Sequence, residues 1–214
     1  MPTNRAAAEL SSSHTGSPFR RLVAEDDWQS LPIAVRRRFE RVLAPGETAA
    51  FVGQVAETHL SPFGWLTAQL ARLVGAPLPL KELARTAAAV LVTEDDGGDS
   101  QLWTRIYHEP GRLPQVICSV KRFAGPTGLE ECVDCGVGMS LTLHIENRAI
   151  VIRSADYFWR RGKWRLRLPE WLTPGVITVV HREERAGQFS FTLTVEHPLC
   201  GCTIRQIAFF RDAC

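Results

Sequence analysis

The sequence predicts an α+β protein: a strongly curved antiparallel sheet or barrel of roughly nine strands, with two or three N-terminal helices packed on it. Three observations predict this fold class. From Ala84 onward, apolar and polar residues alternate along one segment after another, with short turns between them. Before Ala84, apolar residues recur at helical spacing in several places. A long antiparallel run curls or closes, because an open sheet would expose two unpaired edges.

The chain begins with small polar residues over 1–17, which we interpret as a flexible tail. Residues 18–214 then form a single α+β domain, since their number suits one core better than two. Residues 18–41 have helical spacing in two pieces, and Pro32 suits the first turn of the second piece.

A further amphipathic helix is predicted after Ser61, which can cap it, with Pro62 in its first turn and Gly75 as its stop. We interpret it as a helix packed on the sheet. The alternatives are a lid over a cavity and a membrane-surface helix. The membrane alternative is weak, because Arg72 is the one cation on the polar face.

The strand segments show which residues face the core. In residues 137–146, Met139, Leu141 and Leu143 alternate with polar residues, as Phe189 and Phe191 do further on. The predicted strand segments are 48–58, 87–94, 102–109, 113–123, 137–146, 148–159, 163–171, 175–184, 188–197 and 202–210.

Composition excludes several classes of protein. Hydrophobic residues make up 45% of the 214, and 25 Lys and Arg against 23 Asp and Glu give a net charge of +2. Nucleic-acid binders usually carry a clear basic excess, so we expect no nucleic-acid partner. The interleaved aromatics and cations of residues 157–165 are better explained by a strand pair than by a base-stacking platform. No apolar run reaches the roughly 20 residues of a membrane span, and we expect a cytoplasmic protein with reduced thiols.

The densest polar pattern lies in residues 121–143, where a Gly-Pro-Thr-Gly turn precedes Glu130 and Glu131. Counting back by twos from Met139 places Glu131 inside the barrel and Glu130 outside. An inward carboxylate would have a raised pKa and could act as a general acid or base. The alternative is that Glu131 forms an ion pair with Lys121 or Arg122 and holds the loop.

Two histidines and four cysteines are further candidates. His181 and His197 end apolar stripes and face the core, either as buried structural residues or as catalytic partners of Glu131. The pairs Cys132/Cys135 and Cys200/Cys202 could bind zinc, although independent thiols are the simpler interpretation. We predict no cofactor, with zinc as the alternative.

Separate motifs resemble one family. They are KRFAGPTGLEE (121–131), GVGM (136–139), DYF (156–158), LPEWLTPG (168–175), the strand ending in His181, and FSFTLTVEHP followed by RQIAFFRD. On these motifs the chain resembles the bacterial family called domain of unknown function 4166. The resemblance implies relatives joined to dehydrogenase-like domains, hence a dehydrogenase-like protein as a possible partner. It does not extend to the cysteine pairs, and the chain has no GxGxxG motif entering a helix.

These observations lead to three functional hypotheses. The first is a binding module whose apolar cavity holds a hydrophobic small molecule. The residues expected to line or orient it are Lys121, Arg122, Glu130, Glu131, Met139, Tyr157 and His197. The second is an enzyme that uses Glu131, with His197 or His181, as general acid and base beside the dehydrogenase-like partner. The third is a zinc-stapled interaction domain.

Overall fold

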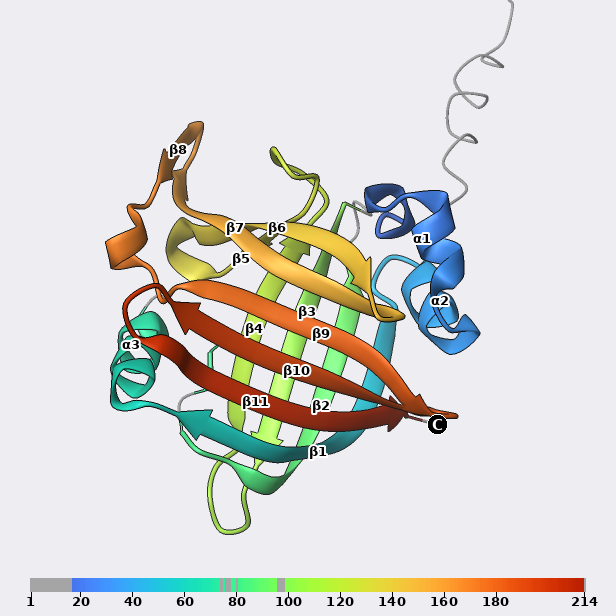
Figure 1. Ribbon diagram of the computed structural model, residues 1–214, viewed down its shortest axis with the longest axis horizontal. Coiled ribbons are helices and arrows are strands. Elements are labelled where there is room, and N and C mark those ends of the chain that lie inside the picture. Colours follow the sequence, from blue (N-terminus) through green and yellow to red (C-terminus); the bar gives the residue numbers. More distant parts are fainter. Residues whose placement is uncertain (1–16, 74, 76–77, 80, 96–98, 214) are drawn as a thin grey trace, which may run out of the picture.

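The computed structural model describes residues 17–73, 75, 78–79, 81–95 and 99–213 (Figure 1). The predicted tail lies outside these residues, except for Ser17. Ser17 is buried, and its hydroxyl donates a hydrogen bond to the backbone oxygen of Phe39. Ser17 therefore packs with the folded domain.

Eleven antiparallel strands form one sheet, and pairing between β6 and β7 closes ten of them into a barrel. The eleventh strand, β8, extends from β7 outside the ring. The strands are β1 (Thr48–Leu60), β2 (Ala84–Glu94), β3 (Ser100–His108), β4 (Gln115–Arg122), β5 (Glu130–Cys132), β6 (Val137–Glu146), β7 (Ala149–Arg161), β8 (Trp164–Arg167), β9 (Val176–Arg185), β10 (Gln188–His197) and β11 (Gly201–Asp212). The predicted antiparallel barrel is confirmed. The strand that the prediction missed is β5, whose three residues are too few to show alternation.

The helices lie at two opposite sides of the barrel, with α1 and α2 on one and α3 on the other (Figure 1). A 3₁₀ turn over Arg20–Leu22 precedes α1 (Glu25–Ser30) and α2 (Ile33–Glu40). The third helix, α3 (Pro62–Arg72), packs on the start of β11. The predicted helices packed on the barrel are confirmed, and they flank it on two sides.

Helix α3 begins as the sequence predicts. The Ser61 hydroxyl accepts a hydrogen bond from the Gly64 backbone N–H at 3.0 Å, and Pro62 occupies the first turn. Gly64 also lets the helix approach β11, because a Cβ there would lie 2.0 Å from the Thr203 backbone oxygen. The helix ends at Arg72, and Gly75 closes the next turn with φ at +71°.

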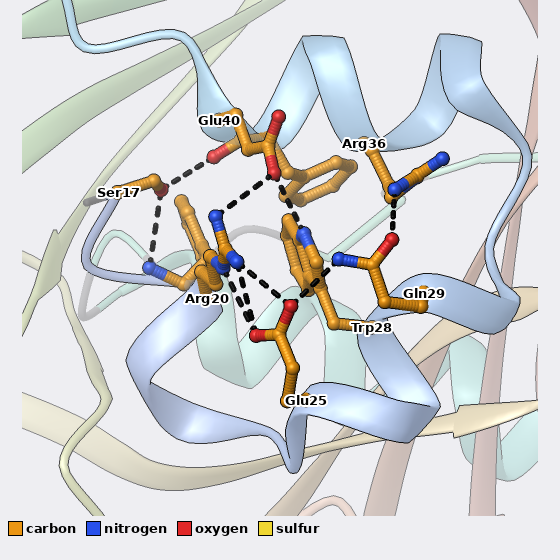
Figure 2. A network of polar contacts seen from close by, with 9 residues as sticks. Ser17, Arg20, Glu25, Trp28, Gln29, Arg36 and Glu40 are labelled. Carbon is orange, nitrogen blue, oxygen red and sulfur yellow. Dashed lines mark hydrogen bonds and ion pairs between the residues drawn. The ribbon is translucent and has the colours of Figure 1, made fainter.

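A polar network joins the 3₁₀ turn, α1 and α2 (Figure 2). The fully buried Trp28 donates its indole N–H to Glu40 Oε1 at 2.8 Å. Arg20 forms ion pairs with Glu25 at 2.8 Å and with Glu40 at 3.6 Å. Together these contacts hold the three short elements as one unit, although each is too short to be stable alone.

Candidate functional site

An apolar cavity of about 570 Å³ opens beside α3. It lies between helix α3, the neighbouring strands β5, β6 and β7, and the segment that follows β8. We call it the mouth. Its walls are lined by Phe63, Leu66, Thr67, Leu70, Ala71, Leu78, Glu131, Val133, Val137, Gly138, Met139, Tyr157, Trp159, Leu168, Trp171, Leu172, Thr173, Pro174 and Ile177.

A smaller cavity of about 100 Å³ lies inside the barrel. It shares Leu78, Glu131, Met139 and Ile177 with the mouth, so the two cavities are neighbours across these side chains. Most of its wall is apolar, and its polar side chains include Arg105, Lys121 and Glu131 from adjacent strands. The apolar mouth therefore lies next to an inner cavity whose wall carries a charged group.

The charged group is centred on Glu131. One carboxylate oxygen, Oε2, accepts from Lys121 Nζ at 2.6 Å, and the two residues are direct partners across β4 and β5. The other oxygen, Oε1, accepts from the Ser119 hydroxyl at 2.6 Å and from Arg105 Nη2 at 3.2 Å. Both oxygens are therefore occupied, and the ion pair with Lys121 that was the alternative interpretation is formed.

The electrostatics of Glu131 differ from the prediction of a raised pKa. Burial raises the pKa, but the charges of Lys121 and Arg105 and the hydrogen bonds from Lys121 and Ser119 outweigh it and lower the pKa to about 2. The predicted rise is wrong, because alternation along one strand does not show which charges face the carboxylate. A carboxylate with this pKa stays ionised at neutral pH and has no proton to donate.

Lys121 and Arg105 give the cluster an excess of positive charge. Two cations face one carboxylate, and the Lys121 side chain is 5% exposed. Lys121 Nζ also lies 4.8 Å from the centre of the Trp103 ring. Burial and the neighbouring Arg105 lower the pKa of Lys121, while Glu131 opposes the shift. Lys121, Arg105 and Glu131 together therefore carry one more positive than negative charge.

Arg105, Ser119 and Trp103 were missed by the sequence interpretation. Trp103, Arg105 and Tyr107 alternate along β3, and Ser119 and Lys121 do so along β4. An arginine in phase with two aromatic residues that face the core was the feature that could have identified this cation.

Glu130 forms a separate cluster outside the barrel, as the alternation predicts. The side chain is fully buried and accepts from Arg160 Nη2 at 2.6 Å, with Arg165 Nη2 at 3.4 Å. Gly125 makes room for this carboxylate, because a Cβ at Gly125 would lie 2.2 Å from Glu130 Oε1. Glu130 therefore joins the Gly-Pro-Thr-Gly turn to the β7–β8 hairpin, and it lines neither the mouth nor the inner cavity.

The remaining predicted ligand residues divide into two groups. Met139 lines both cavities, and Tyr157 lines the mouth while its hydroxyl donates to the Gly175 backbone oxygen at 2.7 Å. Arg122 is exposed, and His197 packs on the Phe63 ring at 4.7 Å. Neither Arg122 nor His197 lines the mouth or the inner cavity.

His181 lies on the α2 side, away from Glu131. It is 1% exposed, packs against Phe39, Phe189 and Phe191, and its Nε2 lies 3.1 Å from Arg38 Nη1. Burial and the Arg38 charge hold its pKa well below the usual 6.5. His181 is therefore neutral in the folded state, and the structure does not bring it together with Glu131 or His197.

This environment makes His181 a source of pH-dependent stability. The unfolded state binds a proton at His181 as the pH falls below 6.5, whereas the folded state does not. Acidification from about pH 7.5 to about pH 5.5 should therefore lower the free energy of unfolding by about 1.4 kcal/mol from this group alone. Urea unfolding across this pH range should show the loss of stability in wild type and not in His181→Phe. The control His144→Gln, which replaces an exposed histidine, should keep the loss. An unchanged pH slope in His181→Phe would contradict the assignment.

The four cysteines named as an alternative zinc site differ in their exposure. Cys135, Cys200 and Cys202 are exposed free thiols and Cys132 is half-buried. In the described residues, no three His, Cys, Asp or Glu side chains lie close enough together to hold a metal ion. Cys132 has a raised pKa, chiefly from burial.

Comparison with known proteins gives one match. The sequence profile of a family described as Domain of unknown function (DUF4166) matches residues 31–210, which include all of the barrel strands except the last two residues of β11. Neither the curated proteins nor the solved structures contain a match. Within the described residues, no helix is long and apolar enough to cross a membrane.

Proposed function

The chain belongs to the DUF4166 family, and we propose that it binds a hydrophobic small molecule with an anionic head group, such as a long-chain fatty acid, inside the barrel. The head group would lie beside Lys121 and Arg105, and the apolar tail would fill the mouth under α3. Met139 and Tyr157 would contact the tail, since both line the mouth.

The observation that carries this proposal is the excess positive charge in the wall of the inner cavity, next to the apolar mouth. Burying an unpaired carboxylate is costly, so a ligand with such a head group needs fixed cations where it is desolvated. Lys121 and Arg105 supply two, of which Glu131 neutralises one. The volume of the mouth, about 570 Å³, falls within the usual range for small-molecule sites.

An enzyme that uses Glu131 as general acid is less well supported. The Glu131 pKa of about 2 and the donors on both of its oxygens favour a structural anion over a proton donor. The dehydrogenase-like partner and the cytoplasmic location stay predictions from the sequence. The binding function needs no partner protein.

A pair of ligands that differ only in the head group tests the proposal. Hexadecanoic acid and hexadecan-1-ol compete with a fluorescent polyene fatty acid for the purified protein. We expect the acid to bind about 10- to 100-fold more tightly than the alcohol, because hydrogen bonds to charged groups contribute about 1.5–3 kcal/mol. Equal affinities, or no binding of either compound, would overturn the proposal.

A matched pair of variants identifies the cation. Arg105→Met leaves the Lys121–Glu131 ion pair and makes the cluster neutral, so the preference for the acid should fall about tenfold. Arg153→Met removes an exposed arginine from β7 and should leave the preference unchanged. Alcohol binding should persist in both variants, which shows that each is folded.

A further inference from the structure

We propose that the surface around the mouth docks on an anionic lipid membrane, from which the barrel takes up its ligand or to which it delivers it. This inference deepens the proposed function and rests on it for the nature of the cargo. The docking surface itself rests on other residues, which we call the rim: Leu66 and Leu70 of α3, Trp164 and Leu166 of β8, and Trp171 and Leu172 of the following turn.

The rim exposes large apolar side chains in one region. Trp164 and Trp171 are 81% and 79% exposed, and the four leucines are each about half exposed or more. Leu66, Leu70, Trp171 and Leu172 line the mouth directly. Figure 1 shows β8 and the turn that follows it on the same side of the barrel as α3. Large apolar side chains exposed together around a cavity mark an interaction site.

The β7–β8 hairpin extends this apolar surface outward. Trp159 of β7 lines the mouth and lies directly opposite Leu166 of β8. Trp164 is two residues before Leu166 and so lies on the same face of the ribbon. The apolar face therefore continues from the mouth along Trp159 and Leu166 to Trp164 near the hairpin tip.

Charge identifies the partner. Residues 160–172 contain five Lys and Arg and one carboxylate, Glu170. Arg160 and Arg165 point toward Glu130, but Arg161, Lys163 and Arg167 are exposed and make no ion pair among the described residues. Arg161 lies directly opposite Trp164 on the apolar face of the hairpin, and Lys163 adjoins it in the turn, whereas Arg167 lies opposite Phe158 on the other face. Exposed tryptophans beside free cations suit the boundary between acyl chains and anionic head groups.

The position of the mouth favours a membrane over a protein as the docking partner, because a membrane can hold the ligand. A ligand with a long apolar tail resides in a bilayer, and its transfer through water exposes that tail at a cost of about 0.8 kcal/mol per CH₂. A mouth that opens within an apolar rim allows the tail to pass between bilayer and barrel with little exposure. Helix α3 alone argues against a membrane surface, because Arg72 is the one cation on its polar face. The cations that favour docking lie instead on the β7–β8 hairpin.

Vesicle sedimentation with the full chain tests the docking surface. The vesicles contain phosphatidylcholine alone, or phosphatidylcholine with one third phosphatidylglycerol. We expect clear binding to the anionic vesicles and weak binding to the neutral ones. Exchanging Arg161, Lys163 and Arg167 for Gln should weaken anionic binding about a hundredfold, at about fivefold per cation near the surface. Trp164→Ser with Trp171→Ser should reduce the blue shift of tryptophan fluorescence that vesicles cause in wild type.

The matched control exchanges Arg153, Arg182 and Arg211 for Gln, which changes the net charge equally at exposed positions outside the rim. An equal loss of vesicle binding in this control, no binding by wild type, or self-association through the rim in light scattering would overturn the proposal. Hexadecanoic acid titration without vesicles separates the two ideas. Acid binding without vesicle binding removes the docking surface alone, whereas vesicle binding without acid binding removes the proposed cargo and leaves the surface.

Discussion

Replacing Glu131 with glutamine is expected to lower the free energy of unfolding by about 3–5 kcal/mol, measured by urea unfolding at neutral pH. Among the described residues, this carboxylate is the one anion that contacts both Lys121 and Arg105. Glutamine keeps the shape but removes the charge, so a buried ammonium remains beside a guanidinium without an ionic partner. Removal of one member of a buried pair is strongly destabilising because the other charge stays desolvated.

Two further variants separate this effect from a general one. Glu57→Gln changes an exposed carboxylate on β1 and should alter stability by no more than about 0.5 kcal/mol. Lys121→Met combined with Glu131→Leu should recover much of the loss, since apolar residues of similar volume often replace a buried pair without penalty. If Glu131→Gln left stability unchanged and abolished a turnover, the acid–base hypothesis would return.

The same carboxylate should make the stability of the fold decrease in acid. Its pKa is lowered from 4.5 to about 2, so its contribution to stability is complete above 4.5 and is lost as the pH falls from 4.5 toward 2. Glu131→Gln lacks a titrating group there and should lose less stability over this range. The acid dependence thus reports on the charge of Glu131 independently of the size of the side chain.

Alternation alone was enough to predict the barrel and the inward direction of Glu131. It could not predict the environment of Glu131, because Arg105 lies 26 residues before it and reaches it across β4. The sign of a pKa shift depends on which charges meet across strands, and that requires the register of each pair. Lys121 opposite Glu131 became certain only when the pairing of β4 and β5 was known.

The surroundings of His181 and His197 likewise could not be predicted from the sequence. Core-facing positions were predicted for both, and both are buried. The partner of His181 is Arg38 on α2, 143 residues away, and that of His197 is Phe63 on α3. Helical periodicity predicts that α2 and α3 have apolar faces, but not which end of the barrel each covers. The role of each histidine was therefore outside the reach of local patterns.

Both sides of the barrel carry a cavity. The mouth lies beside α3, and a second cavity of about 320 Å³ lies on the other side, lined in part by Phe39 of α2, which is buried and contacts His181. Trp28 belongs to the same apolar cluster as Phe39, Met139 and Leu141. The N-terminal unit is thus part of the barrel core, although the family profile begins only at residue 31.

Trp28→Ala is accordingly expected to lower the free energy of unfolding by about 3–5 kcal/mol, the range for aromatic truncations in a core. The indole is fully buried, and its loss would also leave Glu40 without its N–H donor. Trp28→Phe retains most of the packing and loses the hydrogen bond, so it should lose about 1 kcal/mol plus a small cavity cost. Urea unfolding of wild type, Trp28→Ala and Trp28→Phe measures the contribution of packing and that of the hydrogen bond to Glu40. A stable Trp28→Ala protein would mean that residues 17–30 are an appendage, and that the core is complete within the span of the family profile.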